Sequence, residues 1–540
     1  MKKYIAFFIM AVAASCVCCH AFADNYRPRT IVTSDGEVDD MDSFVRLLLY
    51  SNDMQIEGLV YSASQFHWAG DGKGTMLKPQ NKVQGGGGFG GFGPRNSEGM
   101  ESMRWLGTSW MQEYIDLYAE VYPNLVKHDS NYPSPDYLKS VVRVGNIMVE
   151  GDLSAPSEGS EFIKSIILDD KPGPVYIQAW GGPNTAARAL MSIEEEFKGK
   201  PGWDEVYRKV SDKVIFTLCL EQDGTYRNYI AKAWPEIRVV HDDIQFNSFA
   251  YLWNRQIPEP YLQYVEGPWN EENILKGHGP LAGRYFTWGD GHVIDDPADR
   301  YGDPAGLERS GRKKYDFISE GDTPTYLMIM DFGLRSTEDP AWGGVGGRYI
   351  PTDDEPRGWK DPGTMDFSML SGPGPGGPGG QRPPREEKPK VEFDRTQGDY
   401  NPFKDDVDSA FPQTRWVPVI QNDFAARADW CVMSYDEANH RPQASVAGPL
   451  DLTVKAGKKV KLKGAATDPD GDKCSLRWWQ YREAGSCDLP VTLKGAESAK
   501  ASFKVPADAP SGSTIHIILE VKDEGTPALT HFQRVVITVK

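Results

Sequence analysis

Three aspartates, Asp35, Asp39 and Asp40, lie within one short turn that follows a buried apolar segment, Thr30–Thr33. Three carboxylates this close repel one another unless a cation lies among them or the amides at a helix N-terminus accept them. One aspartate would suffice to cap the helix that follows. The cluster therefore favours a hard, oxygen-seeking cation such as Ca²⁺, and helix capping is the alternative.

The turn belongs to a pattern in which apolar strands alternate with amphipathic helices. The predicted strands are Thr30–Thr33, Ile56–Ser62, Pro174–Ala179, Val214–Leu218 and Ile237–Val240. The predicted helices include Met41–Tyr50, Thr185–Met191 and Tyr226–Trp234. This alternation predicts an α/β domain, a mostly parallel sheet with helices on both faces. Ligands of such sheets bind at the carboxyl ends of the strands, where the acidic turn, Trp180–Pro183 and Glu221–Gly224 are expected.

From about Pro442 the pattern changes to short alternating segments separated by turn residues. About 100 residues of this kind predict a C-terminal all-β sandwich of immunoglobulin-like type. Asp468–Asp472 resembles the start of a calcium loop, but Trp479 stands where an EF-hand needs glutamate, so an Asx-rich turn is predicted. Trp478 and Trp479 should face opposite sides of one strand.

The two domains should pack against each other. Gln421–Tyr435 is apolar enough to form a docking helix, and the join at Glu437–Pro442 is too short for a loose tether. One of the adjacent tryptophans should then lie in the sandwich core, and the other should face solvent or the first domain.

The N-terminus has the features of an export signal. Lys2 and Lys3 precede an apolar run, Tyr4–Cys19, and Ala21–Ala23 forms a cleavage site, which predicts a signal peptide at residues 1–23. The protein is therefore expected to be exported to the periplasm or the medium, and lipid anchoring at Cys16 is the alternative. No later segment is long and apolar enough to predict a transmembrane span.

The remaining chain is predicted to hold two domains, residues 24–440 and residues 441–540. Glycine-rich and proline-rich insertions near residues 85–93 and 371–390 are interpreted as solvated loops, with a substrate lid as the alternative.

Composition excludes several classes of protein. The chain has 540 residues and a net charge of −18, which disfavours binding to nucleic acid or an anionic membrane through bulk charge. Four cysteines remain after the signal, too few for a disulfide framework, although Cys474 and Cys487 could pair. The mature chain has no C-x-x-C or H-E-x-x-H motif, so a thiolate zinc site or a zincin is not expected.

Several stretches resemble nucleoside hydrolases. Ile31–Tyr50 resembles their N-terminal signature D-x-D-x-G-x-D-D, with Thr33 in place of the first acid. Gly58–Gln65 resembles their G-I-x-x-V-A-G-N strand, with Gln65 at the asparagine position. Trp180–Thr185 resembles their T-G-x-L-T-N turn.

A bacterial family named for cellulose binding is a closer match, and the resemblance extends over nearly the whole mature chain. The stretches that carry it are Glu320–Pro324, Trp342–Tyr349, Gln421–Val432, Glu437–His440 and Trp478–Gly485. Members of this family combine an N-terminal nucleoside-hydrolase-like domain with a C-terminal immunoglobulin-like domain. The resemblance therefore implies the same fold class as the pattern of strands and helices.

The resemblance also implies a Ca²⁺ site and roles for single residues. The ligands would be the carboxylates of Asp35, Asp40 and Asp322 and the main-chain carbonyl of Trp180. Asp35 would in addition act as the catalytic base toward the attacking water. The implied substrate-binding residues are Asp39, Gln65, Asn184, Glu221 and Asp223.

Two departures from nucleoside hydrolases bear on the substrate. Those enzymes often place a histidine just before the late calcium aspartate, whereas Gly321 stands there in this chain, preceded by Glu320. Their E-F-N segment is replaced by Glu221–Asp223. Both changes disfavour nucleosides as substrates. The lone histidines His67, His241 and His292 are interpreted as structural or surface residues.

These observations predict a secreted, calcium-dependent hydrolase of N- or O-glycosidic bonds that acts on a carbohydrate or polysaccharide. The first alternative is a non-catalytic protein that binds cellulose or another polysaccharide on a nucleoside-hydrolase-like scaffold. The second is a scaffold in which the immunoglobulin-like domain only supports the larger domain.

Overall fold

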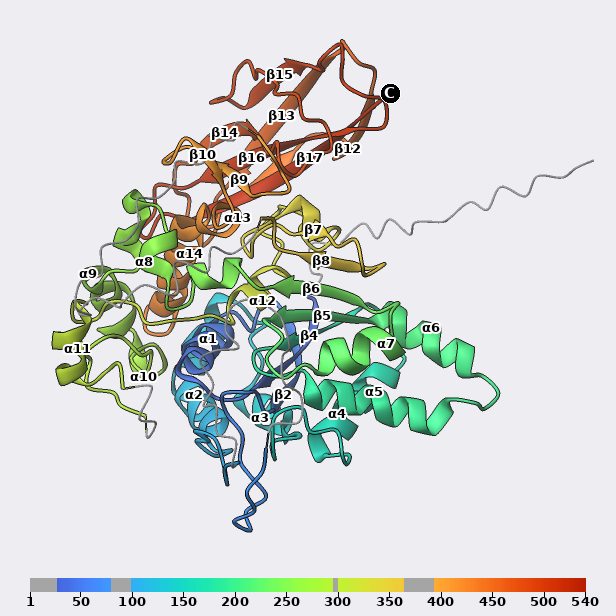
Figure 1. Cartoon of the computed structure of the whole chain (residues 1–540). Coiled ribbons are helices and arrows are strands. Elements are labelled where there is room, and N and C mark those ends of the chain that lie inside the picture. The colour runs from blue at the N-terminus through green and yellow to red at the C-terminus, as the bar shows by residue number, and fades with distance from the viewer. Residues whose placement is uncertain (1–26, 79–98, 295–299, 364–392) are drawn as a thin grey trace, which may run out of the picture.

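The computed structural model describes residues 27–78, 99–294, 300–363 and 393–540 (Figure 1). The predicted signal peptide, Cys16, and the two insertions near residues 85–93 and 371–390 lie outside the described residues. Within them, no helix is long and apolar enough to cross a membrane.

An eight-stranded sheet forms the centre of the larger domain, in the order β3-β2-β1-β4-β5-β6-β8-β7. The strands are β1 (Arg29–Ser34), β2 (Gln55–Tyr61), β3 (Val142–Val144), β4 (Val175–Ala179), β5 (Val214–Cys219), β6 (Arg238–Asp242), β7 (Ile350–Pro351) and β8 (Gly358–Lys360). All neighbours run parallel except β7 and β8. The mostly parallel sheet is confirmed, and the short strands β3, β7 and β8 are additions to the predicted set.

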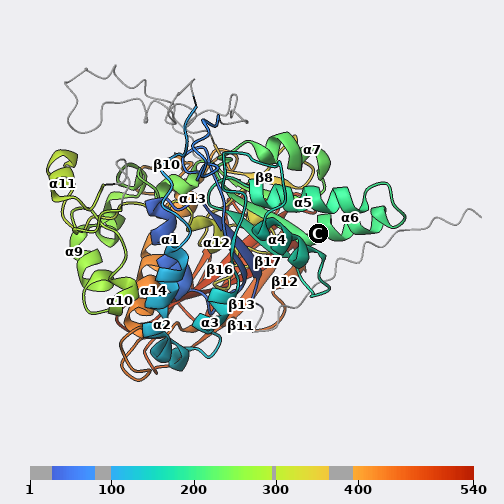
Figure 2. The same ribbon diagram turned by 90° about the horizontal axis from the view of Figure 1, so that it is seen from below.

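Helices cover both faces of this sheet (Figures 1 and 2). On one side lie α1 (Val38–Leu49), α2 (Trp110–His128) and α14 (Val417–Trp430), and on the other α4 (Glu158–Leu168), α5 (Asn184–Phe197) and α6 (Trp203–Lys213). Ile31 and Val32, adjacent in β1, belong to two different hydrophobic clusters. Each face of the sheet thus has its own core, as the period of two in a strand requires.

Shorter elements complete the larger domain. They are α3 (Pro135–Ser140), α7 (Ala231–Ala233), α8 (Trp253–Gln256), α9 (Gly267–Asn270), α10 (Gly279–Ala282), α11 (Pro304–Ser310), α12 (Pro324–Leu327), α13 (Phe411–Thr414), β9 (Asp399–Asn401) and β10 (Asp406–Asp408). The predicted helix Tyr226–Trp234 is a π-helical turn, Tyr226–Ile230, followed by α7.

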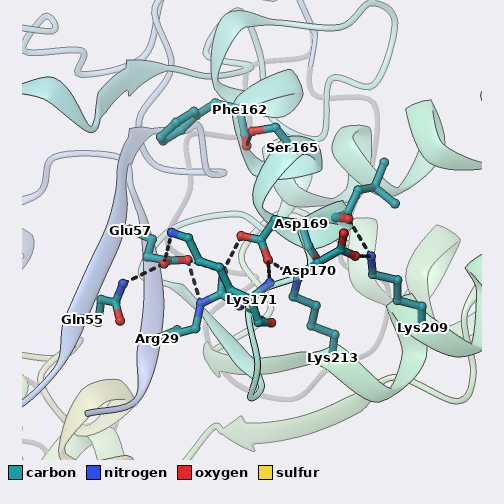
Figure 3. Close-up of polar contacts among 11 residues, drawn as sticks. Arg29, Gln55, Glu57, Phe162, Ser165, Asp169, Asp170, Lys171, Lys209 and Lys213 are labelled. Atoms are coloured by element: carbon teal, nitrogen blue, oxygen red, sulfur yellow. Dashed lines mark hydrogen bonds and ion pairs between the residues drawn. The ribbon is translucent and has the colours of Figure 1, made fainter.

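The amino-terminal edge of the sheet is closed by a network of ion pairs (Figure 3). Arg29 contacts Glu57 and Asp169, each at 2.6 Å. Lys171 binds Glu57 at 2.8 Å, and Lys213 binds Asp169 and also caps α4 through the Asp169 carbonyl at 2.6 Å. Each of these two acids therefore faces two basic side chains, so little uncompensated charge remains at this edge.

A buried ion pair between Arg46 and Glu320 joins α1 to the loop before α12. Both side chains are fully buried, and Arg46 Nη2 lies 2.7 Å from Glu320 Oε1. Glu320 also accepts hydrogen bonds from the hydroxyls of Tyr285 and Thr323. Arg46 donates a further bond to the side chain of Gln421 in α14 at 2.7 Å. The pair thus fixes where this loop meets α1.

The C-terminal domain is a sandwich of two sheets. One has the order β11-β13-β15 and the other β12-β17-β16-β14. The strands are β11 (Gln443–Val446), β12 (Asp451–Val454), β13 (Lys459–Thr467), β14 (Ser475–Gln480), β15 (Lys500–Lys504), β16 (Thr514–Lys522) and β17 (Thr530–Val539). Cys474 and Cys487 are both free, so the possible disulfide between them does not form.

The sandwich packs on the larger domain, as the sequence predicted. Backbone amides of Phe532 and Arg534 in β17 donate to the carbonyls of Phe332 and Gly333, both at 3.0 Å. The Phe532 ring meets Trp416 edge to face at 5.4 Å.

The adjacent tryptophans of β14 confirm the same arrangement. Trp478 is buried in the sandwich core. Trp479 packs on Trp416 of the first domain, with ring centroids 6.2 Å apart.

Removing one partner of the Arg46–Glu320 pair should destabilise the protein strongly. Arg46→Ala leaves a buried carboxylate without its cation, which should lower the free energy of unfolding by about 3–5 kcal/mol. The double variant Arg46→Met/Glu320→Gln should recover most of this loss, because no uncompensated charge remains. Urea denaturation followed by tryptophan fluorescence measures both values, and a loss below about 1 kcal/mol in Arg46→Ala would contradict the anchoring role.

The domain junction gives a second prediction. Phe532→Ala should lower the free energy of unfolding by about 3–5 kcal/mol, because it leaves a cavity beside Trp416. The variant should also release the sandwich faster on limited proteolysis near residue 440. Phe403→Ala is the matched control, since Phe403 is 47% exposed. Ready release of an intact sandwich from the unaltered protein would show that the domains are not docked.

Candidate functional site

Five acidic side chains lie near the carboxyl ends of the central strands. Asp35 and Glu37 follow β1, Asp39 and Asp40 lie in the first turn of α1, and Asp322 precedes α12. Carboxylate oxygens of Glu37, Asp39 and Asp40 lie within 4.8 Å of one another. Burial and the charges of Asp40, Asp39 and Asp35 raise the pKa of Asp322 well above its usual value. Asp322 therefore lies within range of these charges, but among the described residues the oxygens within 4.8 Å of one another include neither those of Asp322 nor those of Asp35.

Asp35 is distinguished by the surroundings of its carboxylate. Both of its carboxylate oxygens are buried, and neither accepts a hydrogen bond among the described residues. Burial raises the pKa of Asp35, while His67, whose Nδ1 lies 3.7 Å from Oδ2, lowers it. A Cβ placed on Gly181 would lie 2.7 Å from Asp35 Oδ1, so only glycine leaves room for the carboxylate.

Asp40 and Trp180 already have partners within the protein. Asp40 accepts hydrogen bonds from the Ser34 hydroxyl and from the Glu37 amide, the latter at 3.1 Å. The bond from the Glu37 amide shows that Asp40 caps the start of α1, as the capping alternative for the acidic turn predicts. The Trp180 carbonyl accepts a bond from Gln222 Nε2 at 2.6 Å. Because each of these oxygens has a second lone pair, the bonds leave room for a cation.

Asp39 lies against the loop that carries Asp322. Its Oδ2 accepts a hydrogen bond from the Ser319 hydroxyl at 3.3 Å. A Cβ at Gly321 would lie 2.8 Å from the same oxygen. Any side chain at position 321 would therefore collide with Asp39, which gives a physical reason for glycine at this point of the loop.

The predicted substrate-binding residues lie along the neighbouring strand ends. Asn184 is fully buried, and its side chain binds the Ser62 hydroxyl at 2.7 Å and the Asn146 carbonyl at 2.8 Å. Asp223 Oδ2 accepts the Asn184 amide at 2.9 Å. These two residues form a hydrogen-bonded wall of the site.

The other two predicted substrate-binding residues differ in their surroundings. Glu221 pairs with Arg227 at 2.9 Å, so its carboxylate faces that guanidinium. Gln65 is half-buried, and its amide N–H donates to the Gln222 carbonyl at 2.9 Å.

Two side chains at the site were not selected from the sequence. His67 was interpreted as structural or surface, yet it is fully buried, with Nδ1 3.1 Å from Glu37 and near Asp35. Glu37 was interpreted only as part of the acidic turn. His241 and His292 lie away from the cluster beside Glu355 and Asp290, at 3.0 and 3.6 Å. His67 lies two residues after Gln65, where a strand ends. This position is the feature of the sequence that could have identified His67 as a residue of the site.

The donor set suits a hard cation. All the clustered side-chain donors are carboxylate oxygens, the ligands that Ca²⁺ takes, and no thiolate or paired imidazole set replaces them among the described residues. In the described part of the chain, His67 and Arg104 form ion pairs with these acids, and Arg104 lies 3.8 Å from Glu37.

Comparisons with known proteins identify the family of the chain. Residues 29–349 match the model for the family described as cellulose-binding Sde182, nucleoside hydrolase-like domain. Residues 459–539 match the model described as cellulose-binding protein Sde0182, C-terminal domain. No curated protein sequence gives a significant match.

The fold is seen in one solved structure in particular. A nucleoside hydrolase-related hypothetical protein from Saccharophagus degradans, described as associated with carbohydrate metabolism, is 24% identical, with a TM-score of 0.64 over 95% of this chain and 100% of that chain. The plant nucleoside hydrolase PpNRh1 is 10% identical, with a TM-score of 0.30 over 64% of this chain and 96% of that chain.

The resemblance inferred from the sequence is thereby confirmed for the family and for the fold class. The first family model alone spans more than half of the chain. The chain belongs to the cellulose-binding Sde182 family, with a nucleoside-hydrolase-like domain followed by the family's C-terminal domain.

Proposed function

We propose that the protein is an exported, calcium-dependent hydrolase that cleaves glycosidic bonds in a carbohydrate. The observation that supports this proposal is the environment of the Asp35 carboxylate. Its carboxylate is buried among four other acids at the carboxyl ends of the strands, and neither of its oxygens accepts a hydrogen bond among the described residues. His67 Nδ1, which lowers the pKa of Asp35, lies 3.7 Å from Oδ2, so both oxygens keep room for a cation or a water molecule.

Each acid at the site has a defined part in the proposed reaction. Asp35, Asp40 and Asp322 would hold Ca²⁺ with the Trp180 carbonyl, and Glu37 is a further candidate ligand. When bound, the ion would supply positive charge that orients a water molecule and lowers the pKa of that water.

The chain's own residues would perform the proton transfer and bind the substrate. Asp35 would accept the proton of the attacking water, as a general base. Asp39 would bind sugar hydroxyls beside it. The remaining negative charge would favour a transition state with oxocarbenium character.

The geometry at Gly321 supports a carbohydrate rather than a nucleoside as the substrate. No side chain can project from this position, because even a Cβ would collide with Asp39. The position at which nucleoside hydrolases often carry a histidine therefore supplies no proton to a leaving base. The description of the family as cellulose-binding and the association of the Saccharophagus relative with carbohydrate metabolism also favour a polysaccharide.

A second candidate function is binding of a polysaccharide without catalysis. The same missing side chain at Gly321 favours it, together with the family description as cellulose-binding. In that case the acids would hold a structural cation or sugar hydroxyls, and Asp35 would have no role as a base.

The first experiment concerns the metal. Purified full-length protein should retain about one Ca²⁺ per chain after dialysis, as measured by elemental analysis. Asp40→Ala and Asp322→Ala should lose it, because each removes a carboxylate from the cluster. Asp436→Ala is the matched control, since Asp436 is an exposed acid outside the site. Stoichiometric zinc, or neither bound metal nor a thermal shift on adding calcium, would refute the proposal.

The second experiment separates hydrolysis from binding. Asp35→Asn keeps the size of the side chain and one oxygen but removes the base, so turnover should fall roughly 10²–10⁴-fold while substrate binding falls much less. Asp40→Ala should instead lose calcium, binding and turnover together. The assay is a panel of furanosides, pyranosides and nucleosides. Binding of a polysaccharide that is equal with and without Asp35, with no hydrolysis by the unaltered protein, would favour the second function.

A further inference from the structure

Two histidines at the junction between the domains form a continuous chain of polar contacts. His440 Nδ1 lies 2.8 Å from Asp470 Oδ1, and His440 Nε2 lies 2.9 Å from His128 Nδ1. At the far end, His128 Nε2 lies 3.0 Å from the Met433 carbonyl oxygen. The backbone amide of His440 also donates to the second oxygen of Asp470 at 2.6 Å. The chain therefore runs from a carboxylate through two imidazoles to a carbonyl.

This chain of contacts connects the two domains. His128 is the last residue of α2 in the larger domain, and Met433 follows α14. Asp470 lies in the turn between β13 and β14 of the sandwich. His440 belongs to the short segment that joins the domains and is only 6% exposed. Each contact along the chain therefore helps to hold the sandwich turn against the end of α2.

The two imidazole rings have the geometry of a hydrogen-bonded pair. Their facing nitrogens are 2.9 Å apart while their centroids are 5.2 Å apart, so the rings meet edge to edge. Trp430 packs against both rings, with centroid distances of 5.3 Å to His128 and 5.1 Å to His440. Tyr435 lies on His440 at 3.9 Å. Because the faces of aromatic rings attract cations, these neighbours favour a charged imidazole.

The number of protons in the chain follows from its two ends. A carboxylate and a backbone carbonyl only accept hydrogen bonds, so the three contacts need three protons. Two neutral imidazoles supply only two. Every arrangement of two protons therefore sets two lone pairs against each other at Asp470, between the rings or at Met433. The fully bonded chain holds one additional proton.

The additional proton belongs on His440. Both ring nitrogens of His440 then donate, one to Asp470 and one to His128. Imidazole is more basic than a carboxylate, so Asp470 keeps its negative charge. Burial and the charge of His440 lower the pKa of His128, against the effect of its bond to the Met433 carbonyl. The second ring therefore stays neutral and passes the chain on to Met433.

Other charges surround the chain. In the sandwich turn, Asp468 Oδ1 accepts the amide of Asp470 at 3.0 Å, so a second acid lies close to the first. The charged neighbours on the other elements are Lys127 in α2, Arg427 in α14, and Asp436 and Arg441 in the joining segment. Both arginines are paired with Asp423, at 2.9 and 2.6 Å, which reduces their effect on His440. Lys127 is exposed, so solvent and salt screen it.

We propose that this chain is a pH-sensitive latch between the two domains, closed by one proton on His440. When that proton leaves, one of the three contacts becomes repulsive, and the sandwich turn loosens from the end of α2. In the open junction the two histidines are exposed and mostly neutral above about pH 6.5. The closed junction then binds one more proton than the open one, so closing weakens as pH rises. The latch does not depend on the proposed hydrolase function.

A fourth proton breaks the chain as well. On His128 Nδ1 it would face the N–H of His440, and the lowered pKa of His128 shows that the closed junction disfavours it. Below about pH 6.5 the open junction takes up this proton, so closing weakens on the acid side too. The latch should therefore hold most firmly near pH 6.5, the ordinary histidine value.

Asp470→Asn tests the latch, because the asparagine amide can donate to Nδ1 of a neutral His440. All three contacts then form without the additional proton. The rate of limited proteolysis near residue 440 should rise at least roughly tenfold from pH 6.5 to pH 8.5 in the unaltered protein, but less than about twofold in Asp470→Asn. Each rate is divided by that of an unstructured peptide with the same cleavage site, which removes the pH dependence of the protease. Asp472→Asn is the matched control, since it removes an acid from the same turn and should behave like the unaltered protein.

A similar pH dependence in Asp470→Asn and in the unaltered protein, or none in either, would overturn the latch. Nitrogen NMR of histidine-labelled protein gives a readout that does not depend on cleavage. Near pH 7.5, His440 should show two protonated ring nitrogens in the unaltered protein and one in Asp470→Asn. The signal is assigned by its loss in His440→Gln. A neutral His440 in the unaltered protein at this pH would also overturn the proposal.

Discussion

The buried ion pair between Arg46 and Glu320 holds together the two segments that build the acidic site. Arg46 lies in α1, which carries Asp39 and Asp40, and Glu320 lies two residues before Asp322. Removing two charges from water is costly, and the cost is offset only by close geometry and further hydrogen bonds. Tyr285, Thr323 and Gln421 supply those bonds. Carboxylates that repel one another can therefore stay close, because packing outside the cluster fixes their backbones.

Buried acids have different surroundings at the amino-terminal and at the carboxyl-terminal ends of the central strands. At the amino-terminal edge Glu57 and Asp169 face three basic side chains, those of Arg29, Lys171 and Lys213 (Figure 3). At the carboxyl-terminal edge, Glu37 pairs with His67 and Arg104, while burial and neighbouring acids raise the pKa of Asp40 and of Asp322. Carboxyl groups whose pKa is raised by burial and by like charges are frequent at ligand sites, so this edge is the candidate site.

The sequence predicted the parts of the fold that depend on local patterns. The strands β1, β2, β4, β5 and β6 each contain a short apolar run, and α1 has clear helical spacing, so all were found. The strands β3 and β8 have only three residues each, too few to show an alternation of apolar and polar residues, so they could not be predicted. Within the site, adjacent acids were visible as a cluster, but Asp322 was assigned only through a family resemblance. The position of His67 beside Asp35 depends on a contact between the ends of two different strands, which the sequence alone does not show.

Three glycines make room for the acids of the site. Gly181 makes room for Asp35, Gly182 for Asp223 and Gly321 for Asp39, and a Cβ at any of them would meet a carboxylate at 2.8 Å or less. The close packing of acids thus requires the absence of side chains at these points. At Gly321 the same absence removes the position from which a histidine could protonate a leaving base. Crowding of the acids and the absence of a histidine at this position are two consequences of one steric constraint.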